Sequence, residues 1–223
     1  MGEIEVAIEH LEPRLSKWIL LEYKHVSKMV GKERLHFTNI IQRKDIELLS
    51  KYGIVHKESI VKLIHKSKWD NVLILDPRSN KLLEPQDFTG RRNLVVIGGI
   101  MGDHPPRGRT YQLLTSRILR ENPRNVKVVS LGKHQFSIDG TAYMVLQVFK
   151  GRRITEIPIV KGVSIKLKAY VRDAELEIYL PFAYPLINGK PLLTPGLVDY
   201  LRHGILSEEV EIIEKFLRTR VLT

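Results

Sequence analysis

The chain has 223 residues, of which 43% are hydrophobic and 27% charged, the composition of a globular protein with one domain or two small ones. Its 36 Lys and Arg against 25 Asp and Glu give a formal net charge of +11. This charge favours work beside a polyanion such as RNA or a ribosome, although it also serves solubility alone. The absence of cysteine excludes disulfides, thiolate catalysis and cysteine-ligated metals. With no signal sequence and no apolar run of membrane-spanning length, we expect a cytoplasmic protein.

The N-terminal part predicts a strand and a helix followed by shorter elements. Ile4, Val6 and Ile8 alternate with other residues at the period of a half-buried strand. Pro13 can begin a helix, whose apolar residues recur at helical spacing until Gly31 ends it. We then expect a strand at residues 35–41, a helix around 46–49 that ends by residue 53, and a short amphipathic helix at 57–66.

Three later segments are continuous apolar runs with the length of a buried strand. They span residues 72–75, 94–97 and 126–131, and each ends in a loop that contains Asp, Gly or Pro. Helices are predicted at residues 111–120 and, ended by Gly151, within residues 133–151. This alternation predicts an α/β fold with a mostly parallel sheet and flanking helices. Ligands of such sheets bind beyond the carboxyl ends of the strands, where these three loops should meet.

The glycine-rich loop after the second of these strands has the features of a ligand-binding edge. Gly98, Gly99 and Gly102 leave the backbone accessible, and Asp103 adds a carboxylate. Thr110 can cap the helix that follows. Taken alone, the same loop is equally compatible with a tight strand-to-helix turn that carries a solvated aspartate, so its interpretation depends on the neighbouring loops.

Several familiar catalytic motifs are absent from the sequence. There is no Walker A sequence, the loop glycines do not fit G-x-G-x-x-G, and no serine lies in a nucleophile elbow. The eight histidines show no metalloprotease spacing, so we expect no metal site. His104 beside Asp103 could shuttle protons, or it is a hydrogen-bonded loop residue.

The C-terminal part changes to extended segments. Two such segments precede two short helices, which we expect to begin at Thr194 and Ser207. No repeat and no low-complexity linker separates this part from the rest. We therefore expect a single domain over residues 1–223, in which residues 152–223 form a C-terminal extension.

Three loop sequences resemble those of a known family. They are LDPRS at residues 75–79, GGIMGDHPPRGRT at 98–110 and SLGKHQFSIDGTA at 130–142, joined near the N-terminus by IEHLEP and WILLEY. Over residues 8–202 the chain resembles the SPOUT (trefoil-knotted) methyltransferases, in the branch of the yeast protein-arginine methyltransferase that modifies a small-subunit ribosomal protein. The resemblance implies a deep C-terminal trefoil knot. It also implies S-adenosyl-L-methionine (SAM) bound in a bent form by knot loops within residues 70–151.

The resemblance further implies which residues bind SAM. Backbone amides and carbonyls of the three loops would read the adenine edge, while Ile100, Leu131 and Phe136 would form apolar walls unless they are ordinary core residues. The implied cofactor-binding residues are Leu75, Asp76 and Pro77 in the first loop, Gly98, Gly99, Ile100, Gly102 and Asp103 in the second, and Leu131, Gly132, Gln135, Phe136, Asp139 and Thr141 in the third.

For an arginine acceptor, carboxylates are the expected partners. A guanidinium stays protonated in proteins and carries five N–H donors, so carboxylates would orient it and accept the proton released as the new bond forms. The catalytic candidates are Asp103 and Glu22. The substrate-binding candidates are the carboxylates Glu9 and Glu12, the stacking aromatics Trp18 and Tyr23, and Arg107 and Arg109 as contacts for phosphates or acidic segments. The alternatives are a solvated helix end, core packing of the aromatics and a basic loop without a partner.

Three functions stay open at this point. The first is SAM-dependent methylation of an arginine in a ribosomal protein, the second is methylation of rRNA or tRNA, and the third is a non-catalytic, basic ribosome-binding module. The glycines and Asp103 argue against the third, and the acidic residues near the N-terminus favour arginine over RNA because carboxylates repel phosphates. The expected partner is a ribosomal protein or subunit, with RNA contact as an alternative and no membrane. The oligomeric state is either a monomer or a knot-mediated homodimer.

Overall fold

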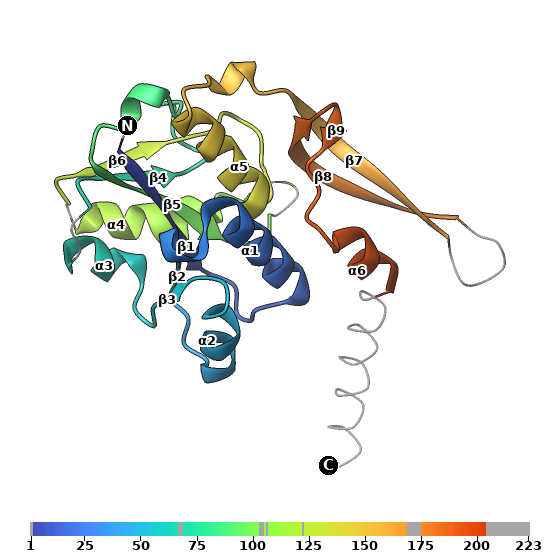
Figure 1. Cartoon of the computed structure of the whole chain (residues 1–223), viewed down its shortest axis with the longest axis horizontal. Coiled ribbons are helices and arrows are strands. Elements are labelled where there is room, and N and C mark those ends of the chain that lie inside the picture. The colour runs from blue at the N-terminus through green and yellow to red at the C-terminus, as the bar shows by residue number, and fades with distance from the viewer. Residues whose placement is uncertain are drawn as a thin grey trace, which may run out of the picture.

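The computed structural model describes residues 2–66, 69–102, 105, 107–121, 123–168 and 175–203. A six-stranded sheet has the strand order β3-β2-β1-β5-β4-β6, and a smaller sheet has the order β7-β8-β9 (Figure 1). All pairings in the larger sheet are parallel, and those in the smaller sheet are antiparallel. The predicted α/β class with a mostly parallel sheet is confirmed.

The elements of the described residues have the following bounds. The strands are β1 Glu3–His10, β2 Leu35–Thr38, β3 Ile54–Val55, β4 Asn71–Leu75, β5 Arg92–Gly99, β6 Val126–Val129, β7 Ile159–Lys168, β8 Glu175–Ile187 and β9 Lys190–Pro191. The α-helices are α1 Lys17–Val30, α2 Arg43–Leu49, α3 Ile60–Lys66, α4 Ser116–Arg120, α5 Ile138–Phe149 and α6 Leu197–His203. A π-helical turn at Tyr111–Thr115 leads into α4, and short 3-10 turns lie at Lys32–Arg34, Pro85–Asp87 and Ile154–Glu156.

Three predicted helix starts were wrong, and a fourth cannot be compared. The helix expected to begin at Thr194 begins at Leu197, and the Thr194 hydroxyl donates to the Asp139 carboxylate instead. Helix α1 begins at Lys17 rather than at Pro13, because the Ser16 side chain accepts a hydrogen bond from the Ile19 backbone N–H and so caps the helix. Thr110 does not act as a cap, because its own backbone is already helical and its side chain makes no capping bond. The helix expected to begin at Ser207 lies outside the described residues.

The apolar residues of β5 alternate between the two faces of the larger sheet. Leu94 and Val96 pack with residues of α3 and α4, and Val95 and Ile97 pack with residues of α1 and α5. Because helices cover both faces, the strands can be apolar throughout, as is usual in parallel sheets.

Strand β5 continues through Gly98 and Gly99, beyond the predicted end at Ile97, because both glycines pair with β1. Successive residues of a strand point to opposite faces. A Cβ atom at position 99 would overlap the Tyr23 hydroxyl and lie 2.8 Å from the Glu9 carbonyl oxygen, whereas one at position 98 would lie at an ordinary 3.5 Å from Ile100. Gly99 therefore allows α1 to approach the end of β5 closely. Gly98 points to the opposite face, toward Ile100 in the loop that follows.

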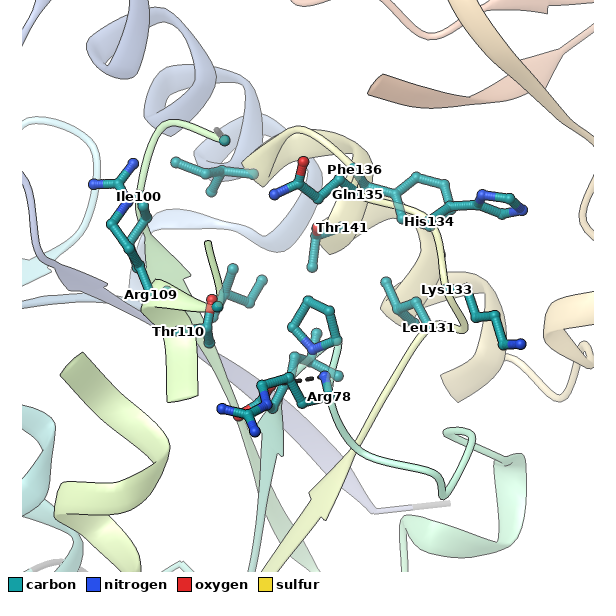
Figure 2. A pocket seen from close by; sticks show the side chains of 18 of the residues that line it. Arg78, Ile100, Arg109, Thr110, Leu131, Lys133, His134, Gln135, Phe136 and Thr141 are labelled. Carbon is teal, nitrogen blue, oxygen red and sulfur yellow. Dashed lines mark hydrogen bonds between the residues drawn. The ribbon is translucent and has the colours of Figure 1, made fainter. Parts of the chain in front are cut away.

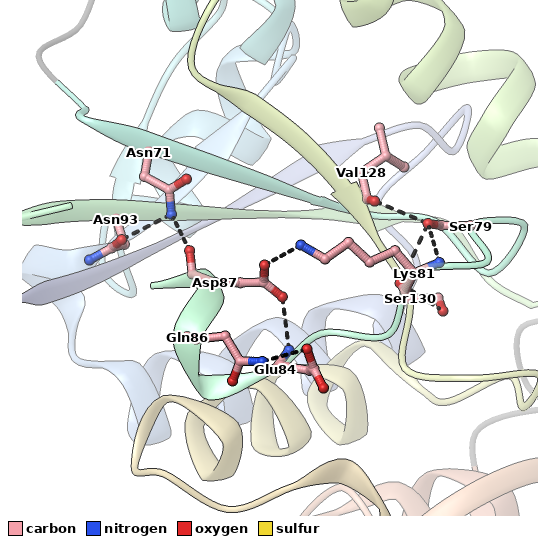
Figure 3. Close-up of polar contacts among 9 residues, drawn as sticks. All are labelled: Asn71, Ser79, Lys81, Glu84, Gln86, Asp87, Asn93, Val128 and Ser130. Carbon is pink, nitrogen blue, oxygen red and sulfur yellow. Dashed lines mark hydrogen bonds and ion pairs between the residues drawn. The ribbon is translucent and has the colours of Figure 1, made fainter. Parts of the chain in front are cut away.

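The connection from β4 to β5 is held by a set of polar contacts (Figure 3). The Asn71 amide donates to the Asp87 carbonyl oxygen at 2.8 Å, and the Asp87 carboxylate accepts from the Glu84 backbone N–H at 3.0 Å. Lys81 forms an ion pair with the same carboxylate. Further along, the Ser79 hydroxyl donates to the Val128 carbonyl oxygen of β6 at 3.0 Å. The loop at the end of β4 is thus fixed against both neighbouring strands.

Strands β7 and β8 form a hairpin that projects from the body of the protein (Figure 1), and the part of β8 around Ala183 lies against two loops of the larger sheet. The Ala183 backbone N–H donates to the Gln135 carbonyl oxygen at 2.7 Å, and Ala183 also forms a β-bridge with Phe136. A Cβ atom on Gly102 would overlap the ring of Phe182. The extension thus contacts the loops that follow β5 and β6.

Helix α6 follows the hairpin and packs on α1. Leu197, Tyr200 and Leu201 form an apolar cluster in which Trp18 and Leu21 of α1 take part. The rings of Trp18 and Tyr200 meet edge to face at 6.3 Å between centroids. This cluster fixes the extension to the N-terminal helix.

The packing at the end of β5 leads to a first prediction. The substitution Gly99→Ala should lower the free energy of unfolding by about 2 kcal/mol, because the added methyl group must displace Tyr23 or the β1 backbone. The matched substitution Gly98→Ala should change it by less than about 0.5 kcal/mol, since its methyl group finds ordinary contacts. Urea unfolding of both variants measures the difference, and equal stabilities would contradict the interpretation of Gly99.

Candidate active site

A cavity of about 520 Å³ lies at the carboxyl ends of β4, β5 and β6 (Figure 2), within the range of roughly 300–1,000 Å³ that is typical of small-molecule sites. The loops that follow these three strands surround it, as expected for a parallel sheet. The described residues that line it are Leu75, Asp76, Pro77, Arg78, Ile97, Gly98, Ile100, Gly102, Arg107, Gly108, Arg109, Thr110, Leu131, Gly132, Lys133, His134, Gln135, Phe136, Ile138 and Thr141.

Most of the residues that the resemblance assigned to SAM lie together in this lining. Gly99 and Asp139 are not among the lining residues: the packing of Gly99 on Tyr23 and the full burial of Asp139 account for this. Asp103, the first catalytic candidate, and the neighbouring His104 lie outside the described residues.

Several lining residues were not predicted from the sequence. Arg78, Lys133 and His134 stand inside the quoted loop sequences and could have been found from their position beside the implied residues. The guanidinium of Arg78 lies over the ring of Tyr111, 4.5 Å from its centroid, a cation–π contact. The sequence did not indicate this contact, because Arg78 lies in the loop after β4 whereas Tyr111 lies in the turn before α4.

Asp76 carries an unsatisfied polar atom at the cavity. Its residue surface is 1% exposed, and its Oδ1 accepts a hydrogen bond from the Arg78 backbone N–H at 2.9 Å. Its Oδ2 is buried without a hydrogen-bond partner. Because an unsatisfied buried oxygen is costly, a ligand that offers a hydroxyl or amine donor here would be stabilised.

Glu22 belongs to a buried polar cluster behind the cavity. Its Oε1 accepts from the Trp18 indole N–H at 2.7 Å, and its Oε2 accepts from the Ile138 backbone N–H at 2.8 Å. The neighbouring Asp139 contacts His25 at 2.7 Å and accepts from the Thr194 hydroxyl at 2.6 Å. Glu22 is therefore not exposed to the cavity but holds the first turn of α5, which contributes Ile138 to the lining.

The environment of this cluster changes the proton affinity of its groups. Burial and the neighbouring Asp139 raise the pKa of Glu22 to about 8, although the N–H donors of Ile138 and Trp18 act in the opposite direction. Burial, with Glu22 and Asp139, also raises the pKa of the Tyr184 hydroxyl. Glu22 is consequently protonated to a large extent at neutral pH.

Glu9 and Tyr23, two predicted substrate-binding residues, are buried. Glu9 accepts hydrogen bonds from the Thr38 and Ser59 hydroxyls, both at 2.5 Å, and from the Ile60 backbone N–H at 2.9 Å, so it ties β1 to the start of α3. Tyr23 has no exposed surface. Neither side chain lines the cavity, and Tyr23 offers no face for a substrate to stack on.

Glu12 and Arg109 meet at the edge of the cavity. Glu12 Oε1 accepts from Arg109 Nη1 at 2.9 Å and from the Met101 backbone N–H at 2.9 Å. Arg109 Nη2 donates to the Met101 carbonyl oxygen. Through these bonds the β1–α1 junction holds the loop after β5, and both Arg109 and Arg107 line the cavity.

Among the described residues, no three His, Asp or Glu side chains are grouped so that they could hold a metal ion. None of the helices that the structure describes combines the length and apolar character needed to cross a membrane.

Comparison with known proteins identifies the family. The family model "Protein arginine N-methyltransferase SFM1-like" matches residues 5–208. The chain belongs to this family. It is also 32% identical over 207 residues to protein arginine N-methyltransferase SFM1 of Saccharomyces cerevisiae, covering 87% of this chain and 92% of the yeast protein.

Solved structures agree with the sequence comparison. Yeast SFM1 complexed with S-adenosylhomocysteine (SAH) matches with a TM-score of 0.71 and 30% identity over 89% of this chain and 94% of that chain. The complex with SAM matches with a TM-score of 0.72 and 29% identity over 91% of each chain. A Trm10 structure from Thermococcus kodakaraensis, 15% identical with a TM-score of 0.52 over 68% of this chain and 96% of that chain, shares the fold. The predicted family, SPOUT fold class and methyltransferase class are thereby confirmed.

The Glu22 cluster leads to a second prediction. A carboxyl group with a raised pKa binds its proton more tightly in the folded protein than in the unfolded chain, so stability falls as pH rises between 4.5 and about 8. Relative to Glu22→Gln, the wild-type protein should lose up to about 4 kcal/mol of unfolding free energy between about pH 5 and pH 9.

Denaturant unfolding at both pH values measures this effect. Glu33→Gln, which removes an exposed carboxylate, serves as the control and should follow the wild type. A constant difference between Glu22→Gln and the wild type across the pH range would contradict the assignment.

Proposed function

We propose that the protein is a SAM-dependent methyltransferase that modifies an arginine side chain of a ribosomal protein and binds SAM in the cavity at the ends of β4, β5 and β6. The observation that carries the proposal is the convergence of the three resemblance loops on one cavity in a member of the SFM1-like family. The complexes of yeast SFM1 with SAM and SAH support the choice of cofactor.

The residues of the cavity fit SAM. Apolar side chains such as Leu131 and Phe136 suit the faces of an adenine ring. The unsatisfied Asp76 Oδ2 suits a ribose hydroxyl or an amine, and Arg78 and Lys133 suit a carboxylate. When bound, SAM supplies a methyl group activated by the positive sulfonium.

The residues of this chain would aim the acceptor and remove its proton. Guanidinium nitrogen is a poor nucleophile while protonated, and the guanidinium loses one N–H proton as the N–CH₃ bond forms and the S–CH₃ bond breaks. We assign the acceptance of that proton to Asp103, which follows the cofactor glycines in the sequence. Glu22, bonded to the Ile138 backbone N–H, would act by positioning the first turn of α5 beside the cavity.

The substrate is proposed to be a ribosomal protein within a ribosomal subunit. The formal net charge of +11 favours association with an RNA-rich particle. Arg78, Arg107 and Lys133 at the cavity could contact phosphates, and this same observation favours the alternative of RNA methylation. The cytoplasmic location and the choice between a monomer and a knot-mediated homodimer stay predictions.

The trefoil knot and the single domain over residues 1–223 are also proposals. The β4–β5 connection lies against the chain that leads from β6 to α5: Ser130 donates to the Lys81 carbonyl oxygen and accepts from the Leu83 backbone N–H, both at 2.8 Å. Phe88 and Phe149 meet edge to face at 5.1 Å. Such close association of the two segments supports a knotted arrangement, and the contacts of α6 with α1 support a single domain.

The proposed activity is tested by following a labelled methyl group. The protein is incubated with methyl-labelled SAM and ribosomal subunits, after which proteins and RNA are separated and counted. Label in arginine of a ribosomal protein is expected. Label in RNA would establish the alternative, and label in neither fraction, with SAH binding intact by calorimetry, would leave only the non-catalytic module.

The role of Asp103 leads to a separate prediction. Asp103→Ala should lower kcat by about 100-fold or more, since it removes the proposed proton acceptor, while the Kd of SAH changes by less than about threefold because the loop backbone binds the cofactor. Asp199→Ala serves as the matched control, because that aspartate is exposed on α6. Unchanged turnover of Asp103→Ala would remove this residue from the mechanism.

A further inference from the structure

We propose that the Glu12 carboxylate and the Met101 carbonyl oxygen form the binding site for the acceptor guanidinium, and that Arg109 occupies this site until the substrate arrives. The inference rests on the proposed arginine methyltransferase activity and adds the location of the acceptor site. We call these two groups the Glu12 site.

The contacts of Arg109 are those expected for a bound guanidinium. One terminal nitrogen donates to Glu12 Oε1 at 2.9 Å, and the other donates to the Met101 carbonyl oxygen. Planar N–H groups directed at a carboxylate and a carbonyl are the usual way in which proteins hold arginine. The Met101 backbone N–H bonds the same Oε1 at 2.9 Å, so the two acceptors are fixed relative to each other.

The location of the Glu12 site fits an acceptor. Arg109 lines the cavity proposed for SAM, and Figure 2 shows its side chain at the cavity edge beside Ile100. The side chains of Arg109 and Glu12 are only 26% and 16% exposed, so their ion pair is partly shielded from water and stronger than one on an open surface.

Two other predicted carboxyl groups, Glu9 and Glu22, already have hydrogen-bond partners within the protein. Glu9 is bonded to two hydroxyls and the Ile60 backbone N–H. Glu22 is bonded to Trp18 and the Ile138 backbone N–H. Among the described candidates, Glu12 differs because its side-chain partner is itself a guanidinium at the cavity.

A second guanidinium can bind well only if Arg109 leaves. Arg78, Arg107, Arg109 and Lys133 line the cavity, whereas Asp76 is the single acidic side chain among its described lining residues. An incoming cation is therefore repelled unless it gains a carboxylate. We place the exchange with Arg109 at Glu12, because Glu12 already holds a guanidinium, whereas Asp103, assigned above as the proton acceptor, lies outside the described residues. The long arginine side chain can move aside by rotation about its own bonds. Arg109, a residue of the protein itself, thus competes with the substrate arginine for the Glu12 carboxylate.

Binding of ethylguanidinium, a mimic of the arginine side-chain end, tests the inference by calorimetry on the full chain loaded with SAH. Wild-type protein should show no binding at millimolar concentrations, because Arg109 holds the site. Arg109→Ala should bind ethylguanidinium with a Kd on the order of 1–10 mM. The double variant Glu12→Gln with Arg109→Ala should bind about tenfold more weakly or not at all, since the carboxylate is lost.

Arg43→Ala is the matched control. It removes an arginine that pairs with a carboxylate, Glu47, on the exposed surface of α2 and not in the cavity lining, so it should behave as the wild type. The inference is overturned if Arg109→Ala fails to bind ethylguanidinium while its SAH affinity is normal, if binding survives Glu12→Gln, or if Arg43→Ala gains the same binding. These titrations involve no methyl transfer, so their failure is distinguishable from a failure of the labelling experiment.

Discussion

Two buried carboxyl groups, Glu22 of α1 and Asp139 of α5, hold together the parts of the chain that form one wall of the cavity. Glu22 reaches from α1 to the Ile138 backbone N–H, and Asp139 reaches from α5 to His25 and Thr194. Buried carboxyl groups are tolerated only with such partners, so α1, α5 and the segment before α6 must be positioned together. The loop after β6 leads directly into α5, so these contacts also determine where that loop lies.

The loop after β5 is fixed by segments that are remote from it in sequence. Glu12, from the β1–α1 junction, binds Met101 and Arg109 on one side. Phe182, from β8, lies against Gly102 on the other. The carboxyl edge of a parallel sheet provides the place for a ligand, but these tertiary contacts give the loop its conformation.

The sequence predicted the sheet class and the loops that line the cavity because these depend on local patterns: apolar runs of strand length that end in Asp, Gly or Pro. It could not predict that Gly99 and Asp139 would turn away from the cavity, since that depends on how α1 packs against β5 and α5. The roles of Glu9 and Tyr23 in the core likewise depend on partners more than ten residues away, such as Ser59 and His10. Sequence patterns reflect neighbouring residues, so they do not indicate partners that are distant in the sequence.

Strand β8 packs on the loops after β5 and β6, and this packing decides which shortened forms of the protein would keep the cavity intact. Ala183 and Phe182 lie far beyond the last strand of the larger sheet, yet they touch Gln135, Phe136 and Gly102. A polypeptide shortened to the first 151 residues would retain every strand of that sheet and lose the surface on which two of its ligand loops rest. A ligand cavity with these walls therefore needs the C-terminal strands as well as the larger sheet.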